Sequence, residues 1–211
     1  MTNHDDYILF AAPFTCSLAV HIALRQRGLP VSIRWVSRGP GRLVPDDELA
    51  RVNPKRKVAT LVLPSGEVLT ENAGILLYLD ETHGPSRDAA VRRRLIEWLT
   101  YLGTELHKQV LAPVFDRETG DVQRQDARDR LLPPVLDHLA EELAESATLL
   151  GGSEPSPADA YLFWGLLLLR HRWPEDVQHP ALTGFLERMQ GIPYVREVLS
   201  IEAQQRAASA A

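Results

Sequence analysis

Short apolar runs in the first part of the chain predict a strand, a helix and a second strand. Residues 7–10 and 31–36 are rich in apolar and β-branched or aromatic side chains, as strands are. Between them, residues 17–25 carry apolar side chains at helical spacing. Gly28 follows as a residue that commonly terminates helices. A strand–helix–strand order predicts that the two strands are parallel.

A hairpin and a further helix are predicted next. Residues 58–63 and 68–70 are short apolar runs separated by a Pro-Ser-Gly turn, which is the pattern of a β-hairpin. Apolar residues recur at helical spacing after Asn72, which is expected to cap that helix. With a short helix expected near residues 46–52, the order of elements is that of a thioredoxin-like α/β domain.

After the Gly-Pro-Ser sequence at residues 84–86, the hydrophobic pattern becomes helical throughout. Long helices are predicted at residues 88–115 and 122–146, and two final helices at residues 180–190 and 193–204. We therefore expect a thioredoxin-like domain at residues 1–83, a linker at residues 84–87 and an all-helical domain at residues 88–211.

Two motifs mark particular positions in the helical part. Pro133 and Pro134 lie inside a predicted helix, so we expect a kink or break there, with Leu132 displaced from helical geometry. Further on, Ser156 is followed by a proline and then by Asp159. This spacing predicts a capping box at the start of a helix.

Composition excludes several classes of function. The chain has 211 residues, a formal net charge of −5 and 45% hydrophobic residues, which is ordinary for a globular protein and gives nucleic-acid binding no electrostatic support. Its longest apolar run, residues 160–169, is too short to span a bilayer, and its polar start is not typical of a signal peptide. One cysteine excludes an internal disulfide framework. We expect a cytoplasmic protein without membrane or metal partners.

Cys16 is the first candidate for chemistry because it lies between a predicted strand and a predicted helix. The dipole and free N–H groups of a helix start favour the thiolate and lower the pKa of a cysteine. The residue three positions on is Ala19, so a dithiol redox cycle is not expected, which leaves a mixed disulfide or an activated nucleophile. Ser17 is a neighbouring hydroxyl that could substitute. Equally, Cys16 could be a small buried side chain without a chemical role.

Two further polar features belong to other predicted helices. Residues 71–72 precede a helix, and the free N–H groups of its first turn can hold a carboxylate. A polar stripe that includes Thr104, His107 and Lys108 runs along the long helix predicted at residues 88–115. The stripe fits either an interdomain cleft or a solvated helix face.

Residues 52–79 resemble the signature of the glutathione transferase family, and residues 15–25 and 96–108 resemble its bacterial beta class. The Ser-Pro-Ala-Asp capping motif is similar to one found across the family, so the resemblance covers about residues 7–205. It implies the same two-part fold, glutathione as cosubstrate, a homodimer and a role in detoxification.

The resemblance also implies a role for each candidate residue. The main chain of Val58 would bind the tripeptide backbone, and Glu71 and Asn72 would hold the amino and carboxylate groups of its γ-glutamyl end. Cys16, with Ser17 nearby, would face the sulfur atom. The implied contacts from the helical domain are Thr104, His107 and Lys108, and those of a second pocket for a small hydrophobic electrophile are Phe14, Leu111, Phe115 and Trp164.

The sequence leaves several functions open. Conjugation of glutathione to an electrophile, thiol exchange through Cys16 and glutathione-dependent isomerisation all use the same residues. A second hypothesis is a ligand carrier or an enzyme of specialised metabolism that has lost glutathione chemistry, because Ala59 stands where the family has a cis-proline. A cis bond costs about 3–4 kcal/mol before alanine and roughly 0.5–1 kcal/mol before proline. We therefore expect a trans Val58–Ala59 bond and weak glutathione binding. A pure interaction module is a third reading.

Overall fold

The computed structural model describes residues 6–39, 42–44, 47–115 and 119–209; the side chains at 37–39, 42–44 and 115 are left out of the description. The polar start at residues 1–5 and the first residue of the helix expected at 46–52 lie outside the described residues. Contacts divide the chain into two compact units, Met1–Pro85 with Ile192–Ala211, and Ser86–Gly191. The domain boundaries expected at residues 83 and 88 stay a prediction. The helix expected at residues 193–204 belongs to the first unit by its contacts.

A four-stranded mixed sheet forms the centre of the first unit. Its order is β2-β1-β5-β6, from the strands β1 (Tyr7–Ala11), β2 (Val31–Trp35), β5 (Thr60–Val62) and β6 (Val68–Thr70). β1 pairs with β2 in parallel and with β5 antiparallel, so that Leu9 lies between Ile33 and Leu61. The predicted strand–helix–strand unit and hairpin are both confirmed. A second pair, β3 (Ser37–Gly39) and β4 (Arg42–Val44), was not predicted.

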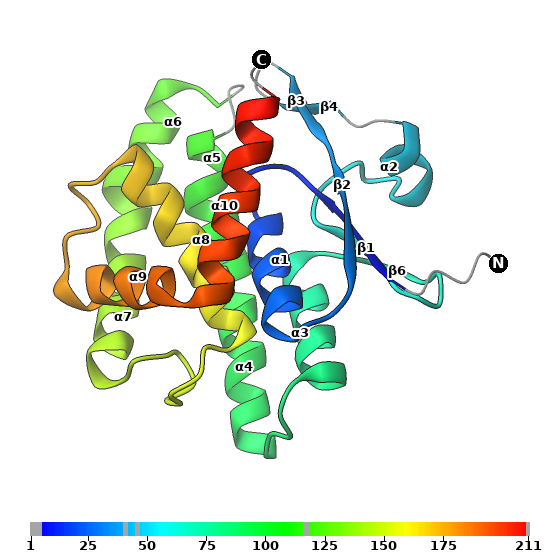
Figure 1. Ribbon diagram of the computed structural model, residues 1–211. Helices are drawn as coiled ribbons and strands as arrows, with labels where there is room; N and C mark the ends of the chain where they lie inside the picture. The colour runs from blue at the N-terminus through cyan, green and yellow to red at the C-terminus, as the bar shows by residue number, and fades with distance from the viewer. Residues whose placement is uncertain (1–5, 40–41, 45–46, 116–118, 210–211) are drawn as a thin grey trace. The chain divides into compact units, whose positions relative to one another are not determined.

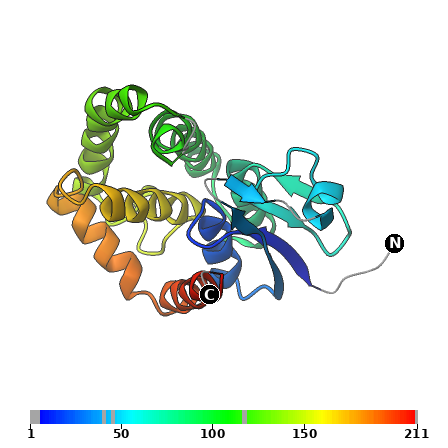
Figure 2. The same cartoon turned by 90° about the horizontal axis from the view of Figure 1, so that it is seen from above.

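Helices cover both faces of this sheet. α1 (Ser17–Gln26) and α3 (Asn72–His83) lie on one face, and the short α2 (Asp47–Val52) lies on the other (Figure 1). Leu49 of α2 packs on Phe10 of β1 in a small buried cluster. α10 (Pro193–Ala208) contacts α1 and runs beside it (Figures 1 and 2). The thioredoxin-like arrangement expected from the sequence is therefore present.

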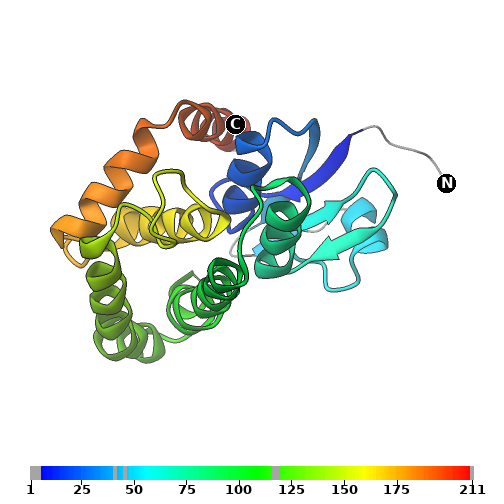
Figure 3. The same ribbon diagram turned by 90° about the horizontal axis from the view of Figure 1, so that it is seen from below.

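The second unit consists entirely of helices over its described residues. They are α4 (Ala89–Tyr101), η1 (Leu102–Leu111), α5 (Ala112–Phe115), α6 (Asp121–Asp126), η2 (Ala127–Leu131), α7 (Leu132–Glu145), α8 (Pro157–Arg172) and α9 (Pro180–Gly191), where η marks π-helical turns. α8 contacts both η1 and α9 and lies between them (Figure 3). α8 takes this central place because apolar side chains surround it on nearly all sides. Among the described residues, no helix has the length and apolar character needed to cross a membrane.

Pro133 and Pro134 lie in a helical run that continues without a gap from α6 through η2 into α7. η2 ends at Leu131 and α7 begins at Leu132, so the two prolines directly follow the π-helical turns. A proline removes an N–H donor from a helix, and π-helical turns are another local irregularity of the helix ladder. The expected break is therefore wrong, and the expected kink stays a prediction. The expected displacement of Leu132 is wrong, since its φ and ψ are −67° and −47°.

The capping box predicted at the start of α8 is confirmed. The Asp159 carboxylate is fully buried and accepts hydrogen bonds from the Ser156 N–H at 2.7 Å, the Ser156 hydroxyl at 2.6 Å and the Leu149 N–H at 2.9 Å. Burial raises the pKa of Asp159, and these hydrogen bonds act in the opposite direction. The box thereby ties the loop before α8 to the helix that forms the centre of the second unit.

Replacing Asp159 by alanine leaves two buried N–H groups without their acceptor. Each unsatisfied buried group costs about 1–3 kcal/mol, so we expect Asp159→Ala to lower the free energy of unfolding by at least about 2 kcal/mol in urea titrations followed by circular dichroism. Asp159→Asn keeps one oxygen acceptor and is expected to lose less. The exposed Asp137 of α7 gives the control Asp137→Ala, and an equal loss in both alanine variants would contradict this account.

Candidate functional site

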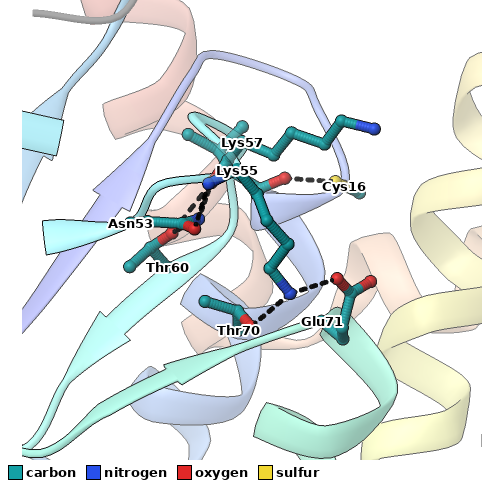
Figure 4. A network of polar contacts seen from close by, with 8 residues as sticks. Cys16, Asn53, Lys55, Lys57, Thr60, Thr70 and Glu71 are labelled. Carbon is teal, nitrogen blue, oxygen red and sulfur yellow. Dashed lines mark hydrogen bonds and ion pairs between the residues drawn. The ribbon is translucent and has the colours of Figure 1, made fainter. Parts of the chain in front are cut away.

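Cys16 lies where the sequence predicted, directly before α1, and is tied to two distant parts of the first unit. Its thiol donates to the Val58 carbonyl oxygen over 3.4 Å, a contact drawn in Figure 4. Its own carbonyl oxygen accepts from the Asn72 side-chain amide over 2.6 Å. The start of α1, the start of α3 and the segment before β5 therefore meet at Cys16.

The Ser17 hydroxyl contacts the loop between β1 and α1, whereas the Cys16 thiol contacts a more distant segment. It is fully buried, and its hydroxyl accepts from the Ala12 N–H at 3.2 Å and lies 2.9 Å from the Thr15 hydroxyl. The Thr15 hydroxyl in turn donates to the Ala12 carbonyl oxygen at 2.8 Å. These contacts fix the loop between β1 and α1 from inside, while the Cys16 thiol, which is only half-buried, is aimed at another segment.

The segment before β5 is held by two polar residues that sequence reasoning did not single out. The Asn53 amide donates to the Lys57 carbonyl oxygen at 3.0 Å and to the Thr60 hydroxyl at 2.8 Å, as Figure 4 shows. The Thr60 hydroxyl donates to the same carbonyl oxygen at 2.8 Å. Asn53 is only 2% exposed. An asparagine directly before a proline was visible as a turn signal, but its pairing with Thr60 was not.

The peptide bond between Val58 and Ala59 is cis, so the prediction of a trans bond is wrong. That prediction used the preference of an isolated dipeptide. In the folded chain, the Asn53 amide holds the Lys57 carbonyl, and the Cys16 thiol donates to the carbonyl of the bond itself. The expectation of weak glutathione binding rested on a trans bond and has no remaining basis.

Glu71 and Asn72 mark the start of α3, and Asn72 does not have the capping role that was predicted for it. Glu71 is the residue that flanks the helix, with φ 68° and ψ 122°, and its side chain makes no capping bond. Its carboxylate pairs with the Lys55 ammonium at 2.7 Å, and that ammonium also donates to the Thr70 hydroxyl (Figure 4). The prediction that Asn72 caps α3 is wrong because Asn72 is the first helical residue and its amide is used by Cys16.

His107 belongs to the second unit, where two aromatic residues of α8 hold it. Its Nδ1 lies 2.7 Å from the Tyr161 hydroxyl, and its ring packs edge-on to Trp164 with centroids 4.7 Å apart. Trp164 also stacks on Tyr161 at 5.8 Å. The imidazole is half-buried in η1. π-helical turns often occur at functional sites. The sequence pattern did not predict the π-helical turns of η1.

The other predicted residues of the helical part are distributed along the same unit. Thr104 and Lys108 are exposed on η1, and the Thr104 hydroxyl donates back to the Thr100 carbonyl oxygen at 3.1 Å. Leu111 and Trp164 are buried. Phe115 ends α5, and its side chain lies outside the described residues. Phe14, by contrast, belongs to the first unit, in the loop before Cys16.

The first unit thus has a thioredoxin-like sheet with a cysteine just beyond the end of its first strand, next to a backbone segment and a helix start. Comparison with known proteins identifies the class more closely. Residues 15–82 match the family described as "Glutathione S-transferase, N-terminal domain". The chain is 35% identical over 207 residues to glutathione S-transferase GstA of Escherichia coli O157:H7, covering 92% of this chain and 98% of GstA. The chain therefore belongs to the glutathione S-transferase family.

Solved structures agree with this assignment. A bacterial beta-class glutathione S-transferase of Sphingomonas chungbukensis has 35% identity and a TM-score of 0.82, covering 92% of this chain and 98% of its own. A sphingomonad glutathione S-transferase in complex with glutathione has 33% identity and a TM-score of 0.79, with coverages of 93% and 98%. The family and the resemblance to its beta class are both confirmed.

The contacts around Val58 predict unequal effects of two neighbouring substitutions. Asn53→Ala removes the two hydrogen bonds that the buried amide donates to the Lys57 carbonyl and the Thr60 hydroxyl, so it is expected to lower the free energy of unfolding by about 1–3 kcal/mol. Lys55→Ala removes only an ion pair whose side chains are 50% and 64% exposed, and exposed pairs contribute at most about 1 kcal/mol. Urea titration of both variants measures the difference. Equal losses would show that Asn53 does not fix this segment.

Proposed function

We propose that this protein is a glutathione transferase that binds glutathione in its first unit and conjugates it, through its sulfur atom, to a small hydrophobic electrophile. One observation carries this proposal: the Cys16 thiol, the Val58 carbonyl and the start of α3 at Glu71 lie together in the first unit. Relatives that carry the name glutathione S-transferase, matched over nearly the whole chain, support the activity.

The chemistry of glutathione fits the parts of this site. The main chain of Val58 pairs with the peptide backbone of the ligand, as an edge strand does with an extended peptide. The Glu71 carboxylate binds the α-amino group, and the first-turn N–H groups of α3 bind the α-carboxylate, which the helix dipole favours. Lys55 gives up its exposed pair with Glu71 at little cost. Lys55 then remains beside the ligand as a positive charge.

Cys16 is the residue that faces the sulfur atom in this proposal. Its half-buried thiol belongs to the N-terminal flank of α1 and donates to the Val58 carbonyl oxygen. The geometry favours Cys16 over Ser17, whose buried hydroxyl is committed to the loop. Cys16 can support the glutathione thiolate during conjugation. Its own thiolate can also attack a disulfide, which would make thiol exchange a second activity of the same site.

The remaining residues of the proposal rest on the family resemblance. Thr104, His107 and Lys108 of the second unit are the residues proposed for polar contacts with glutathione. Those proposed for the electrophile are Leu111, Phe115 and Trp164 of the second unit and Phe14 of the first. The contact of His107 with Tyr161 orients the imidazole for this part. Steady-state rates of His107→Ala, compared with the exposed His171→Ala, measure the contribution of His107. Equal rates would remove His107 from the proposal.

A homodimer, a cytoplasmic location and a role in detoxification complete the proposal and rest on the family resemblance. Sedimentation of the purified chain decides between a dimer and a monomer. The relatives matched over nearly the whole chain carry the name glutathione S-transferase, which favours this proposal over a protein without glutathione chemistry. Isomerisation differs from conjugation only in the second substrate, so it stays an alternative outcome of substrate screening.

Glutathione binding tests the proposal without knowledge of the electrophile. We expect the protein to be retained on glutathione-agarose and eluted by free glutathione. Glu71→Gln removes the negative partner of the α-amino group, and a hydrogen bond to a charged group contributes about 1.5–3 kcal/mol, so we expect the affinity in calorimetry to fall between about tenfold and a hundredfold. Glu67→Gln, an exposed change in the same hairpin, is the matched control. Absence of binding by the unmodified protein would overturn the proposal.

The single cysteine makes thiol exchange easy to recognise. After incubation with glutathione disulfide, we expect mass spectrometry to find one glutathione adduct on the protein, located at Cys16, and none on Cys16→Ala. Conjugation of glutathione to an electrophile is expected to persist in Cys16→Ala, at a reduced rate, because the attacking sulfur atom belongs to glutathione. A complete loss of conjugation together with unchanged glutathione affinity would instead make Cys16 itself the nucleophile.

A further inference from the structure

A buried carboxylate on the last helix contacts the loop that carries Cys16. Glu202 of α10 has no exposed surface, and its Oε2 accepts the main-chain N–H of Phe14 over 2.8 Å. Its Oε1 lies 2.9 Å from Nδ1 of the buried His21 on α1. A buried carboxylate requires partners of this kind. Glu202 therefore links α10 to both the β1–α1 loop and the helix that follows it.

The residue that Glu202 holds has an unusual backbone. Phe14 has a φ of 57°, in the left-handed region that bulky side chains rarely adopt. Such a conformation persists only where the surrounding structure supports it. The hydrogen bond from Phe14 to Glu202 is such a support, and it comes from 188 positions further along the chain.

A second residue of α10 contacts the same phenylalanine. The Arg206 guanidinium lies over the Phe14 ring, 5.7 Å from its centroid. Arg206 follows Glu202 by one helical turn, so both side chains leave the same face of α10. A third contact, the exposed ion pair of Glu197 with Arg25 at 2.8 Å, joins α10 to α1 but does not involve the loop. Figure 2 shows α10 running beside α1.

The support of Phe14 extends to Cys16 because only Thr15 separates them. Thr15 is itself fixed, since its N–H and hydroxyl both bond to the Ala12 carbonyl oxygen. The main chain of Phe14 is thus held from α10, as that of Cys16 is held from α3. We propose that Glu202, assisted by Arg206, is a positioning residue: α10 holds the β1–α1 loop so that the Cys16 thiol stays at the Val58 carbonyl. The consequence for glutathione rests on the proposed function; the position of the thiol does not.

Alkylation of Cys16 reports this position directly, because the chain has one cysteine. The probe is iodoacetamide, and mass spectrometry follows the modified fraction with time in the absence of glutathione. Glu202→Leu removes both hydrogen bonds of the carboxylate. We expect its alkylation rate to rise roughly tenfold, because a loop that opens locally exposes the thiol more often. Glu202→Gln keeps an oxygen for the Phe14 N–H and is expected to restore the slow rate.

Two further variants separate positioning from general destabilisation. Glu197→Leu changes another acidic residue of α10 that does not contact the loop, and its alkylation rate is expected to match that of the unmodified protein. Arg206→Leu changes an exposed residue, and we expect a rise of roughly twofold from loss of the contact with the Phe14 ring. Circular dichroism establishes that each variant is folded.

The outcomes decide the proposal in every case. A folded Glu202→Leu that is alkylated at or below the unmodified rate overturns it, as does an equal increase in Glu197→Leu. If Glu202→Leu does not fold, the comparison of Arg206→Leu with Glu197→Leu decides, and equal rates overturn the proposal. Failure of the unmodified protein to bind glutathione would overturn the proposed function alone, because the alkylation rates are measured without glutathione.

Discussion

The site depends on the hydrogen bond that joins the starts of two helices: the Asn72 amide of α3 donates to the Cys16 carbonyl over 2.6 Å. This contact places a thiol, from the flank of α1, beside the first-turn N–H groups of α3. Both helix starts lie at the edge of the sheet where β1 ends, and ligands of open α/β sheets bind at the carboxyl ends of strands. A tripeptide with a thiol in its centre and a free amino-acid end matches these groups.

The contacts of the site fall into a rigid set and an exchangeable set. Asn53 and Thr60 are buried and hydrogen-bonded to the segment before β5 and to each other, so loss of either removes two buried hydrogen bonds at a cost of about 1–3 kcal/mol. The Lys55–Glu71 pair is half exposed and contributes at most about 1 kcal/mol. A ligand can therefore displace the exposed pair while the buried hydrogen bonds keep the backbone of Val58 in place. Ligand binding at such a site exchanges the partner of Glu71 and leaves the buried hydrogen bonds of Asn53 and Thr60 unchanged.

Sequence patterns predicted what local physics determines. The strand–helix–strand unit follows from periodicity, and the box of Ser156 and Asp159 follows from a three-residue spacing that needs no distant partner. The contact of Asn72 with Cys16 joins residues 56 positions apart, so local capping preference gave the wrong role for Asn72. The Val58–Ala59 bond was predicted wrongly for a similar reason. The residues of the π-helical turns around His107 do not differ in type from those of an α-helix, so these turns were not predicted.

The last helix carries a signal that a closer look at the sequence pattern would have found. Val195, Val198 and Glu202 are the buried residues of α10, and their spacing of three and four places them on one helical face. A carboxylate that continues an apolar stripe needs a buried partner, because an unpaired charge in the interior is strongly unfavourable. A leucine at this position would continue the stripe but leave His21 and the Phe14 N–H without an acceptor. The carboxylate in the stripe therefore predicts polar partners opposite it. They are the Phe14 N–H in the loop that carries Cys16 and His21 on α1.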